Sequence, residues 1–512
     1  MPSVAVPEGI HSLAYEELLR LFFGELRGKL QSQAAHYRID FDPTEVISDR
    51  GVYRDIRFPL DMPTLEEHCD ALYSILPIDE RRRSKILFYR ALSTETGRMF
   101  PWGALTGIRP SFVAAEIYRT FAQSSTFPER DSALYLRRFY GLEASRASLA
   151  VEVARREMAI EAEFEADANI IYFHIPFCSS RCSYCSFPAS DGLTSRADVH
   201  RAYLDQLFAE YDHFVQDLDI QADVIYIGGG TPSIFNLENL KYFCDGLSKR
   251  IDFHRLREAS FEAGRADSLS EEKLRVLRDT GFDHICLNPQ SSDVSVLRAS
   301  ARPLDLKVFE AMYQSARRLG FTSINMDLIL GLPSSSVSDF LESLRYVMSL
   351  GADAVSLHSL ALKRSSDLMT KHLKSQLSAE PGTSDPLADL HLAQAEEQLA
   401  LDEAGLRLRA SGYLPYYLYK HKLALGGLEN LSYARATKET AYNVLMMGDR
   451  RQILSFGAGA SSKFLFQKRL KRFTNVATIR EYQERHLEMA EKKHRIYLQS
   501  HGETRDSHEN GL

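Results

Sequence analysis

The sequence predicts an α/β fold whose centre is an incomplete βα barrel. Residues 169–357 repeat one pattern, in which a short apolar strand, a turn and an amphipathic helix lead to the next strand. Strands that alternate with helices form parallel sheets. Six strands are expected, at 169–175, 223–227, 259–263, 284–288, 323–329 and 354–358. Six units rather than eight leave one side of the barrel open to a large substrate, and active sites of such barrels lie at the carboxyl ends of the strands.

The 512 residues exceed what one hydrophobic core usually sustains, so several domains are expected. Residues 1–165 lack the βα alternation and are expected to form an N-terminal α+β domain that ends in a helical connector. The barrel is assigned to 166–365 and a C-terminal domain to 366–500, with an exposed linker at 375–386. Residues 501–512 are polar and are expected to be a disordered tail.

Helix signals between the strands support this order. The first barrel helix should bury one apolar face, made of Val199, Tyr203, Leu204, Leu207, Phe208 and Tyr211. The segment 268–271 has the form of a capping box. Gly281, Gly320 and Gly351 stand where helices should end.

Composition limits the compartment and the partners. A formal charge of −7 argues against a general nucleic-acid binder, which carries a basic excess. Six cysteines are too few and too scattered for a disulfide framework, and free thiolates need a reducing compartment. No apolar run reaches the roughly 18 residues of a membrane span, and the start lacks the cationic region of a signal peptide. A cytoplasmic protein without a membrane span is expected.

Cys178, Cys182 and Cys185 lie directly after the first predicted strand with the spacing C-x3-C-x2-C. A cubane [4Fe-4S] cluster normally takes four thiolates, so three leave one iron open for a small molecule. The alternative is a structural zinc site, which needs a fourth Cys or His in a paired spacing. His174 is the one nearby candidate for that fourth ligand. Ligand type and spacing favour the iron-sulfur interpretation.

A second motif, Gly228-Gly229-Gly230-Thr231-Pro232, follows the second predicted strand. Glycines let the backbone approach a ligand closely, and their amides can bind a polar group. An ordinary tight turn is the alternative. A Rossmann nucleotide site is disfavoured because no G-x-G-x-x-G opens the following helix.

Polar residues also stand in or just after the later strands, at Glu262, Gln290, Arg302 and Asp327. Buried polar groups need a hydrogen-bond partner or a function. Taken singly, each is expected to be a paired structural group. Taken together, they indicate a ring of ligand contacts at one end of the barrel.

Four segments, 174–178, 228–232, 326–333 and 457–460, resemble the oxygen-independent coproporphyrinogen III oxidase group of radical S-adenosylmethionine (SAM) proteins. The likeness is greatest to the HemZ-type branch, which has similar segments at 101–110, 415–419 and 428–430. It extends from about Arg90 to about Arg495.

This resemblance implies roles for individual residues. Cys178, Cys182 and Cys185 would hold the cluster. The cluster-bound SAM would be lined by Tyr172, Gly229 and Glu262. The HemN-type branch binds a second SAM at positions that here are Tyr184, Gly230, Thr231, Gln290, Arg302, Asp327 and Ala361. That branch has a further cysteine two positions after the third ligand, where this chain has Phe187.

The implied reaction is oxidative decarboxylation of two propionates of coproporphyrinogen III to vinyl groups, which gives protoporphyrinogen IX in anaerobic heme biosynthesis. A 5'-deoxyadenosyl radical from SAM would take a hydrogen from the propionate, and flavodoxin or ferredoxin would supply the electron. The cofactors carry the hard step, while the protein positions the substrate. The alternatives are a HemW-like heme carrier, which lacks the long N-terminal domain, and a HemN-like radical SAM methyltransferase or cyclopropanase.

Four propionates need cations. Candidates are Arg265, Lys363, Arg364, Lys420, His421 and Lys422. In the N-terminal region, Trp102 and Arg109 could meet the porphyrinogen and a propionate, or could instead pack that domain.

Overall fold

The computed structural model describes residues 3–5, 18, 36–39, 45–49, 54–57, 80–105, 109–185, 196–361, 386–420, 428–448, 450–466 and 469–509. The chain divides into two compact units. Unit 1 comprises Met1–Met158, Glu380–Gln398 and Leu418–Leu431, and unit 2 comprises Ala159–Ala379, Leu399–Tyr417 and Ser432–Leu512. The predicted linker lies almost entirely outside the described residues.

The N-terminal part of unit 1 contains both strands and helices, as expected of an α+β region. A four-stranded sheet has the order β1-β2-β3-β4. Its strands are β1 (Ser3–Ala5), β2 (His36–Ile39), β3 (Glu45–Asp49) and β4 (Arg54–Arg57). Four helices follow, α3 (Glu80–Thr96), α4 (Pro110–Ser124), α5 (Pro128–Tyr140) and α6 (Ala144–Ala162). Proline opens both α4 and α5, where its missing N–H leaves no backbone bond unmade.

The large sheet confirms the predicted α/β class and all six predicted barrel strands. Its central strands are parallel and follow chain order, β10-β9-β8-β7-β6-β5. They are β5 (Asn169–Ile175), β6 (Ala222–Gly229), β7 (Glu258–Gly264), β8 (His284–Leu287), β9 (Ser323–Leu330) and β10 (Ala354–Ser359).

Five further strands, which the sequence analysis did not predict, bring the described sheet to eleven. At one edge, β13 (Ile453–Phe456) pairs parallel to β5 and is followed by β14 (Ser461–Phe466) and β15 (Arg469–Thr474). The order at the other edge is β10-β12-β11, with β12 at Glu429–Ala434 and β11 at Leu414–Lys420. The C-terminal part of the chain therefore completes the barrel sheet.

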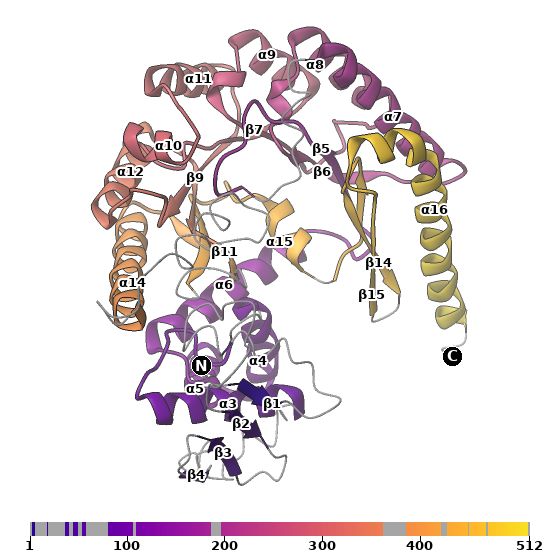
Figure 1. The fold of residues 1–512 in the computed structure, drawn as a ribbon. Coiled ribbons are helices and arrows are strands. Elements are labelled where there is room, and N and C mark those ends of the chain that lie inside the picture. The colour runs from indigo at the N-terminus through magenta and orange to yellow at the C-terminus, as the bar shows by residue number, and fades with distance from the viewer. Residues whose placement is uncertain are drawn as a thin grey trace. The chain divides into compact units, whose positions relative to one another are not determined.

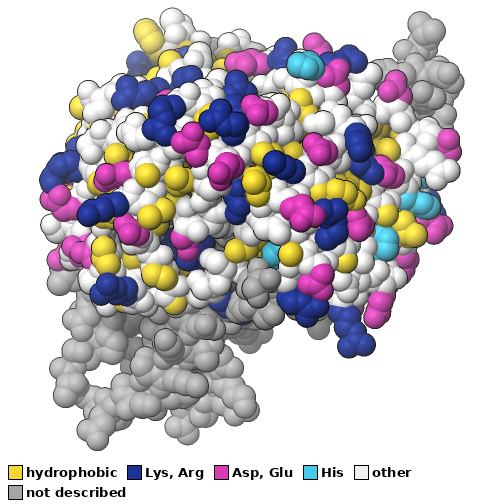
Figure 2. Space-filling model, turned by 90° about the horizontal axis from the view of Figure 1, so that it is seen from above, with side chains coloured by type: hydrophobic (Ala, Val, Ile, Leu, Met, Phe, Trp, Pro, Cys, Tyr) yellow, Lys and Arg dark blue, Asp and Glu magenta, His cyan; other side chains and the backbone are white. Residues whose placement is uncertain are grey.

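Helices cover the outer face of the curved sheet (Figure 1). They are α7 (Ala197–Val215), α8 (Leu237–Ser248), α9 (Glu271–Thr280), α10 (Val294–Ala299), α11 (Leu306–Arg318) and α12 (Val337–Leu350). On α7, the predicted apolar face is buried from Tyr203 to Tyr211, and Val199 at its start is partly exposed. Figure 2 shows basic and acidic side chains interspersed on the face seen from above, without a patch of one sign.

Two long C-terminal helices, α14 (Pro386–Ala410) and α16 (Ile479–Glu509), complete the described chain together with the short α15 (Ala441–Met447). Helix α16 packs along α7 and continues through most of the segment that was expected to be a disordered tail. Helix α15 lies on the concave side of the sheet and contacts β5, β6 and β7 (Figure 1). None of the helices that the structure describes has the length and apolar character needed to cross a membrane.

The helix ends correct one detail of the sequence analysis. Gly281 and Gly351 adopt the left-handed conformation at the C-caps of α9 and α12, and Gly320 follows α11 with φ +83°, as predicted. The capping box predicted at 268–271 is wrong, because Ser270 rather than Ser268 caps α9, accepting from the amide of Lys273. The described capping box is at Ser336 and Asp339, at the start of α12.

Candidate active site

Alternation along the barrel strands separates two faces of the sheet. On β5, Phe173 packs its ring against Tyr211 of α7 and Phe243 of α8, so it faces the outer helices. Its neighbour Tyr172 stacks on Tyr442 of α15 and therefore faces the concave side. The same alternation gives the concave side a set of polar residues from β6 to β10: Tyr226, Glu262, Cys286, Asn325, Asp327, Ser356 and His358.

The three predicted cluster cysteines lie together in the loop that leaves the carboxyl end of β5. Each is a thiol rather than half of a disulfide; Cys182 is 7% exposed, and Cys178 and Cys185 are partly exposed. The amide of Cys185 donates to the carbonyl of Cys182 at 3.0 Å, which folds the loop back on itself. Burial raises the pKa of Cys178 to about 11, although a hydrogen bond from Thr231 opposes the rise. A bound metal would deprotonate such a thiol outright.

The donor set fits a cluster better than a mononuclear site. Among the described residues, no three or more His, Cys, Asp or Glu side chains converge to hold one metal ion. A cubane does not require such convergence, because each thiolate binds a different iron. The zinc alternative needed His174 as a fourth ligand. Its Nδ1 donates to the carbonyl oxygen of Ala458 at 2.5 Å, and its Nε2 packs against Gly229 of the glycine turn, so neither ring nitrogen is directed to a metal shared with the cysteines. The structure therefore favours the iron-sulfur interpretation.

The glycine turn after β6 is packed directly against the cysteine loop. A Cβ on Gly229, whose φ is +113°, would lie 2.1 Å from the His174 ring, and one on Gly230 would lie 2.4 Å from the carbonyl oxygen of Phe177. The amide of Gly230 donates to Ile175 at 2.8 Å, and the amide of Thr231 donates to Phe177 at 2.6 Å. These glycines are required because the turn positions the cysteine loop through backbone contacts.

Glu262 and Asp327 provide two carboxyl groups with different protonation on the concave side. Glu262 accepts the amide of Gly229 at 3.1 Å. Burial and then the negative charge of Asp327 raise the pKa of Glu262 to about 7, against the hydrogen bonds from Gly229 and Tyr226.

Burial also raises the pKa of Asp327, but His358, Asn325 and Ser356 lower it more, and the net shift is downward. The side-chain Nδ2 of Asn325 donates to Asp327 Oδ1 at 2.7 Å, and the Nε2 of His358 lies 3.7 Å from Asp327 Oδ2. One carboxyl group can thus hold a proton near neutral pH while the other stays ionised, a difference that acid–base chemistry can use.

Three stacked tyrosines lie near Glu262. The rings of Tyr226 and Tyr442 are 4.0 Å apart and nearly parallel, and Tyr172 lies about equally far from both, at 6.1 and 6.0 Å. Sequence reasoning identified Tyr172 but missed Tyr226, Tyr442 and His358. The period-two pattern of β6 and β10 could have indicated Tyr226 and His358, whereas nothing local marks Tyr442.

Among the remaining predicted SAM-contact residues, Gln290 follows β8, Ala361 follows β10, and Tyr184 lies in the cysteine loop. Gln290, with φ +66°, bridges to β9, and its side-chain Oε1 is buried with no hydrogen-bond partner in the described structure. Burial raises the pKa of Tyr184, next to Cys185. Ala361 follows β10 and is partly exposed.

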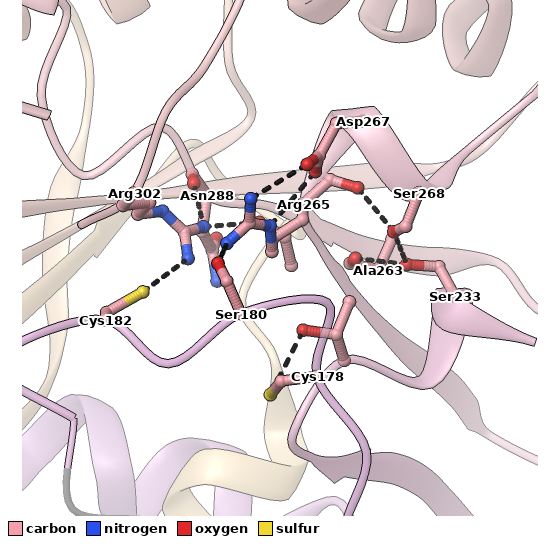
Figure 3. A network of polar contacts seen from close by, with 12 residues as sticks. Cys178, Ser180, Cys182, Ser233, Ala263, Arg265, Asp267, Ser268, Asn288 and Arg302 are labelled. Atoms are coloured by element: carbon pink, nitrogen blue, oxygen red, sulfur yellow. Dashed lines mark hydrogen bonds and ion pairs between the residues drawn. The ribbon is translucent and has the colours of Figure 1, made fainter. Parts of the chain in front are cut away.

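Arg302 is 9% exposed, and its guanidinium is held by protein atoms. It donates to the carbonyl oxygens of Gly264 and Asn288 at 2.8 and 2.7 Å, and to the sulfur of Cys182 at 3.7 Å (Figure 3).

The candidate propionate cations are only partly within the described residues. Arg265 is 5% exposed and binds Asp267 through two nitrogens, at 3.0 and 2.8 Å, and the hydroxyl of Ser180 at 2.9 Å (Figure 3). Its guanidinium is thus engaged in holding the cysteine loop. Lys363, Arg364, His421 and Lys422 lie outside the described residues, as does the side chain of Lys420.

In unit 1, Trp102 and Arg109 both have buried partners. Trp102 is 1% exposed and donates its indole N–H to Glu429 at 2.7 Å. Arg109 forms a 2.6 Å ion pair with Glu157, which also accepts from Ser111 at 3.1 Å. These contacts support the packing interpretation for both residues.

Comparisons with known proteins show which family this chain resembles. The model of the radical SAM superfamily matches residues 172–347. The chain is 30% identical to the oxygen-independent coproporphyrinogen-III oxidase-like protein HemZ of Bacillus subtilis over 429 residues, which cover 82% of each chain. It is 27% identical to the heme chaperone HemW of the same species, over 56% of this chain and 69% of that one. The solved structure of HemN, coproporphyrinogen III oxidase from Escherichia coli, is 22% identical with a TM-score of 0.49, over 66% of this chain and 73% of that one.

The fold and the cysteine loop thus define a radical SAM protein, a class whose cofactors are a [4Fe-4S] cluster and SAM. Within that class, the chain belongs to the family of oxygen-independent coproporphyrinogen-III oxidase-like proteins of the HemZ type.

Proposed function

We propose that this protein catalyses the oxidative decarboxylation of two propionate groups of coproporphyrinogen III to vinyl groups, giving protoporphyrinogen IX. The observation that carries the proposal is the loop of three cysteine thiols at the carboxyl end of β5, beside the polar concave face of the barrel. The 82% coverage by the HemZ relative extends the likeness well beyond the radical SAM core.

Cys178, Cys182 and Cys185 hold the cluster in this proposal, which leaves one iron open for SAM. When bound and reduced, the cluster supplies the electron that cleaves SAM to methionine and a 5'-deoxyadenosyl radical. Tyr172, Gly229 and Glu262 line this first SAM. The carboxyl oxygens of Glu262 can accept hydrogen bonds from the ammonium and ribose hydroxyl groups of SAM. Glu262 also accepts the amide of Gly229, which places it beside the glycine turn.

A second SAM is proposed at Tyr184, Gly230, Thr231, Gln290, Arg302, Asp327 and Ala361. The ionised Asp327 and the buried, unpaired Oε1 of Gln290 support a polar ligand there. The engagement of Arg302 by two carbonyl groups and a sulfur leaves it less available to such a ligand. An electron donor of the flavodoxin or ferredoxin class and a cytoplasmic location complete the proposal.

Each vinyl group requires removal of one hydrogen atom by the adenosyl radical, loss of one CO2, and transfer of one electron to an acceptor. The protein's task is to hold the propionate near the SAM site and exclude water from the radical. The polar residues of β6 to β10 surround the region where this must occur.

The test is anaerobic incubation of the reconstituted protein with SAM, dithionite and coproporphyrinogen III, followed by mass analysis. The expected product has lost two CO2 molecules and four hydrogens, and the Cys182→Ala protein should form none. Cluster-dependent SAM cleavage without that product would contradict the proposed substrate and favour a methyltransferase or cyclopropanase reaction on another molecule.

The match to a heme chaperone supports a second candidate function, in which the protein carries heme. Stoichiometric heme binding by a protein that forms no vinyl product would support that candidate instead. Absorption titration with hemin, run beside the assay, separates the two functions.

A further inference from the structure

Two of the three cysteine sulfurs receive hydrogen bonds from side chains that belong to other parts of the barrel (Figure 3). The hydroxyl of Thr231, in the turn after β6, lies 3.6 Å from the sulfur of Cys178. The guanidinium of Arg302, which follows α10, lies 3.7 Å from the sulfur of Cys182. Both distances are within the range of hydrogen bonds to sulfur, which is a large and weakly accepting atom.

Other contacts hold both donor residues, Arg302 and Thr231, in place. The second terminal nitrogen of Arg302 is fixed by the carbonyl oxygens of Gly264 and Asn288, where β7 and β8 end. The backbone just before Arg302 also holds the cysteine loop, because the amide of Ser183 donates to Ser300 at 3.0 Å. Thr231 is 3% exposed, and its amide bonds to Phe177 next to Cys178. Both donors therefore keep a set direction toward the sulfurs.

The charge of Arg302 differs from that of the other buried arginine beside the loop. Arg265 binds the carboxylate of Asp267 through two nitrogens, so its charge is largely balanced. The bonded partners of Arg302 in the described structure are two carbonyl groups and a thiol, without a carboxylate. The carboxylate of Asp267 acts on Arg302 only through space, because it is bonded to Arg265. A buried positive charge without a bonded carboxylate acts strongly on nearby groups, because few water molecules screen it.

We propose that Arg302 and Thr231 act as positioning residues that raise the reduction potential of the cluster held by Cys178, Cys182 and Cys185. This inference rests on the cluster site of the proposed function. Reduction adds one electron to the cluster, from [4Fe-4S]2+ to [4Fe-4S]+, and makes the ligand sulfurs more negative. Donors aimed at the sulfurs therefore stabilise the reduced form more than the oxidised form.

The experiment is an anaerobic redox titration of the reconstituted full-length protein, followed by electron paramagnetic resonance without SAM. Omitting SAM removes any contribution from a direct contact between these residues and SAM. Thr231→Val keeps the side-chain shape and removes the hydroxyl, and Thr231→Ser restores it. Arg302→Met removes the charge, and Arg302→Lys keeps it.

We expect Arg302→Met to lower the equilibrium constant for reduction about tenfold or more, which for a one-electron couple is about 59 mV per tenfold. Thr231→Val should lower it about threefold, since a neutral hydrogen bond is weaker. Arg302→Lys and Thr231→Ser should recover part of each loss. Ser233→Ala is the matched control, because the Ser233 hydroxyl bonds to Ala263 and Ser268 and, in the described structure, makes no hydrogen bond to a cysteine sulfur (Figure 3). The cluster in Ser233→Ala should have the reduction potential of the wild type.

Wild-type potentials in both Thr231→Val and Arg302→Met would overturn the inference while leaving the cluster site intact. If Arg302→Met fails to take up iron, the comparison of Thr231→Val with Thr231→Ser decides, since both retain the loop geometry. A wild-type protein that binds no [4Fe-4S] cluster would overturn this inference together with the proposed function.

Discussion

Two glutamates on β7, Glu258 and Glu262, are four residues apart and have different hydrogen-bond partners. Glu258, at the start of the strand, accepts the hydroxyl of Ser260 at 2.8 Å and the backbone amides of Ala441 and Tyr442 at 2.5 and 3.3 Å. These bonds hold the start of α15 against the first residue of β7. Glu262 accepts one backbone amide, from Gly229, and faces the ionised Asp327.

Burial raises the pKa of both glutamates, so a raised pKa alone does not identify a functional carboxyl group. The difference lies in the bonded partners. The acceptor oxygens of Glu258 are taken by a hydroxyl and the backbone of one helix, whereas Glu262 lies beside the turn that packs on the cysteine loop. We expect Glu258 to support the fold and Glu262 to serve a ligand, and the following predictions test that distinction between structural and ligand-binding groups.

The largest difference in effect is expected between the substitutions of Cys182 and Cys244 by alanine. Cys182→Ala should abolish the cluster and all SAM cleavage, because it removes a direct ligand in the loop. Cys244→Ala should retain both, since Cys244 is a buried thiol of α8 whose pKa burial raises to about 12. Iron content and the visible spectrum of the anaerobic proteins decide this, and a fully loaded Cys182→Ala protein would overturn the cluster assignment.

Asp327→Ala should leave the cluster and cleavage of the first SAM intact but abolish vinyl formation, because the variant removes the ionised carboxylate proposed for the second SAM. The measurement is 5'-deoxyadenosine release beside product formation. The control is Asp339→Ala at the exposed capping box of α12, which should leave both unchanged. Normal product from Asp327→Ala would rule out the two-SAM arrangement.

A third buried carboxylate, Glu157, tests whether a buried ion pair stabilises the fold without serving a ligand. Burial raises its pKa, and the ion pair with Arg109 opposes that rise. Arg109→Ala should lower the free energy of unfolding of unit 1 by about 3 to 5 kcal/mol with substrate affinity unchanged, because it leaves a buried charge unpaired. Arg82→Ala breaks the more exposed pair with Glu116 and should cost less than about 1 kcal/mol. Weaker substrate binding by Arg109→Ala at an unchanged melting temperature would contradict the packing role.

The pKa of Glu262 predicts a pH dependence of stability in the cluster-free protein. Its folded-state pKa of about 7 is above the ordinary value of 4.5, so between these values the folded state holds a proton that the unfolded state releases. The stabilisation is complete below about pH 4.5 and is lost as the pH rises toward 7, by on the order of 3 kcal/mol. Denaturant unfolding at several pH values measures this slope, which should be smaller in Glu262→Gln. An identical slope in that variant would show that other groups cause it.

The smallest expected effects compare the two glutamates directly. Glu262→Gln should weaken SAM binding by about 1.5 to 3 kcal/mol, the range of a hydrogen bond to a charged group, with little change in stability at neutral pH. Glu258→Gln should reduce stability by about 1 to 3 kcal/mol and leave SAM affinity unchanged. Calorimetric SAM binding and thermal melting on both proteins provide the test. The distinction fails if the two substitutions have the same effects.

Local patterns were sufficient to predict the centre of the fold. The short apolar runs of β5 to β10 and the glycines at 281, 320 and 351 predicted six strands and the ends of the intervening helices, because apolar runs and left-handed caps are properties of short segments. The spacing of Cys178, Cys182 and Cys185 likewise placed the thiols in one loop. Chain order then brought the strand ends, with Glu262 and Asp327, to one side of the sheet.

Long-range pairing decided the rest, because its partners are far apart in the sequence. The short β13 becomes a strand by pairing with β5, where Ile453 lies beside Ile170. Tyr442 joins the tyrosine stack because α15 folds into the concave side, and Arg302 reaches Cys182 because the segment after α10 crosses the cysteine loop. The sequence by itself determined which chemical groups are present and on which strands they lie. The tertiary structure determined which of them are held by other groups and which remain available to a ligand, since hydrogen bonding and burial depend on neighbours that only the folded chain brings together.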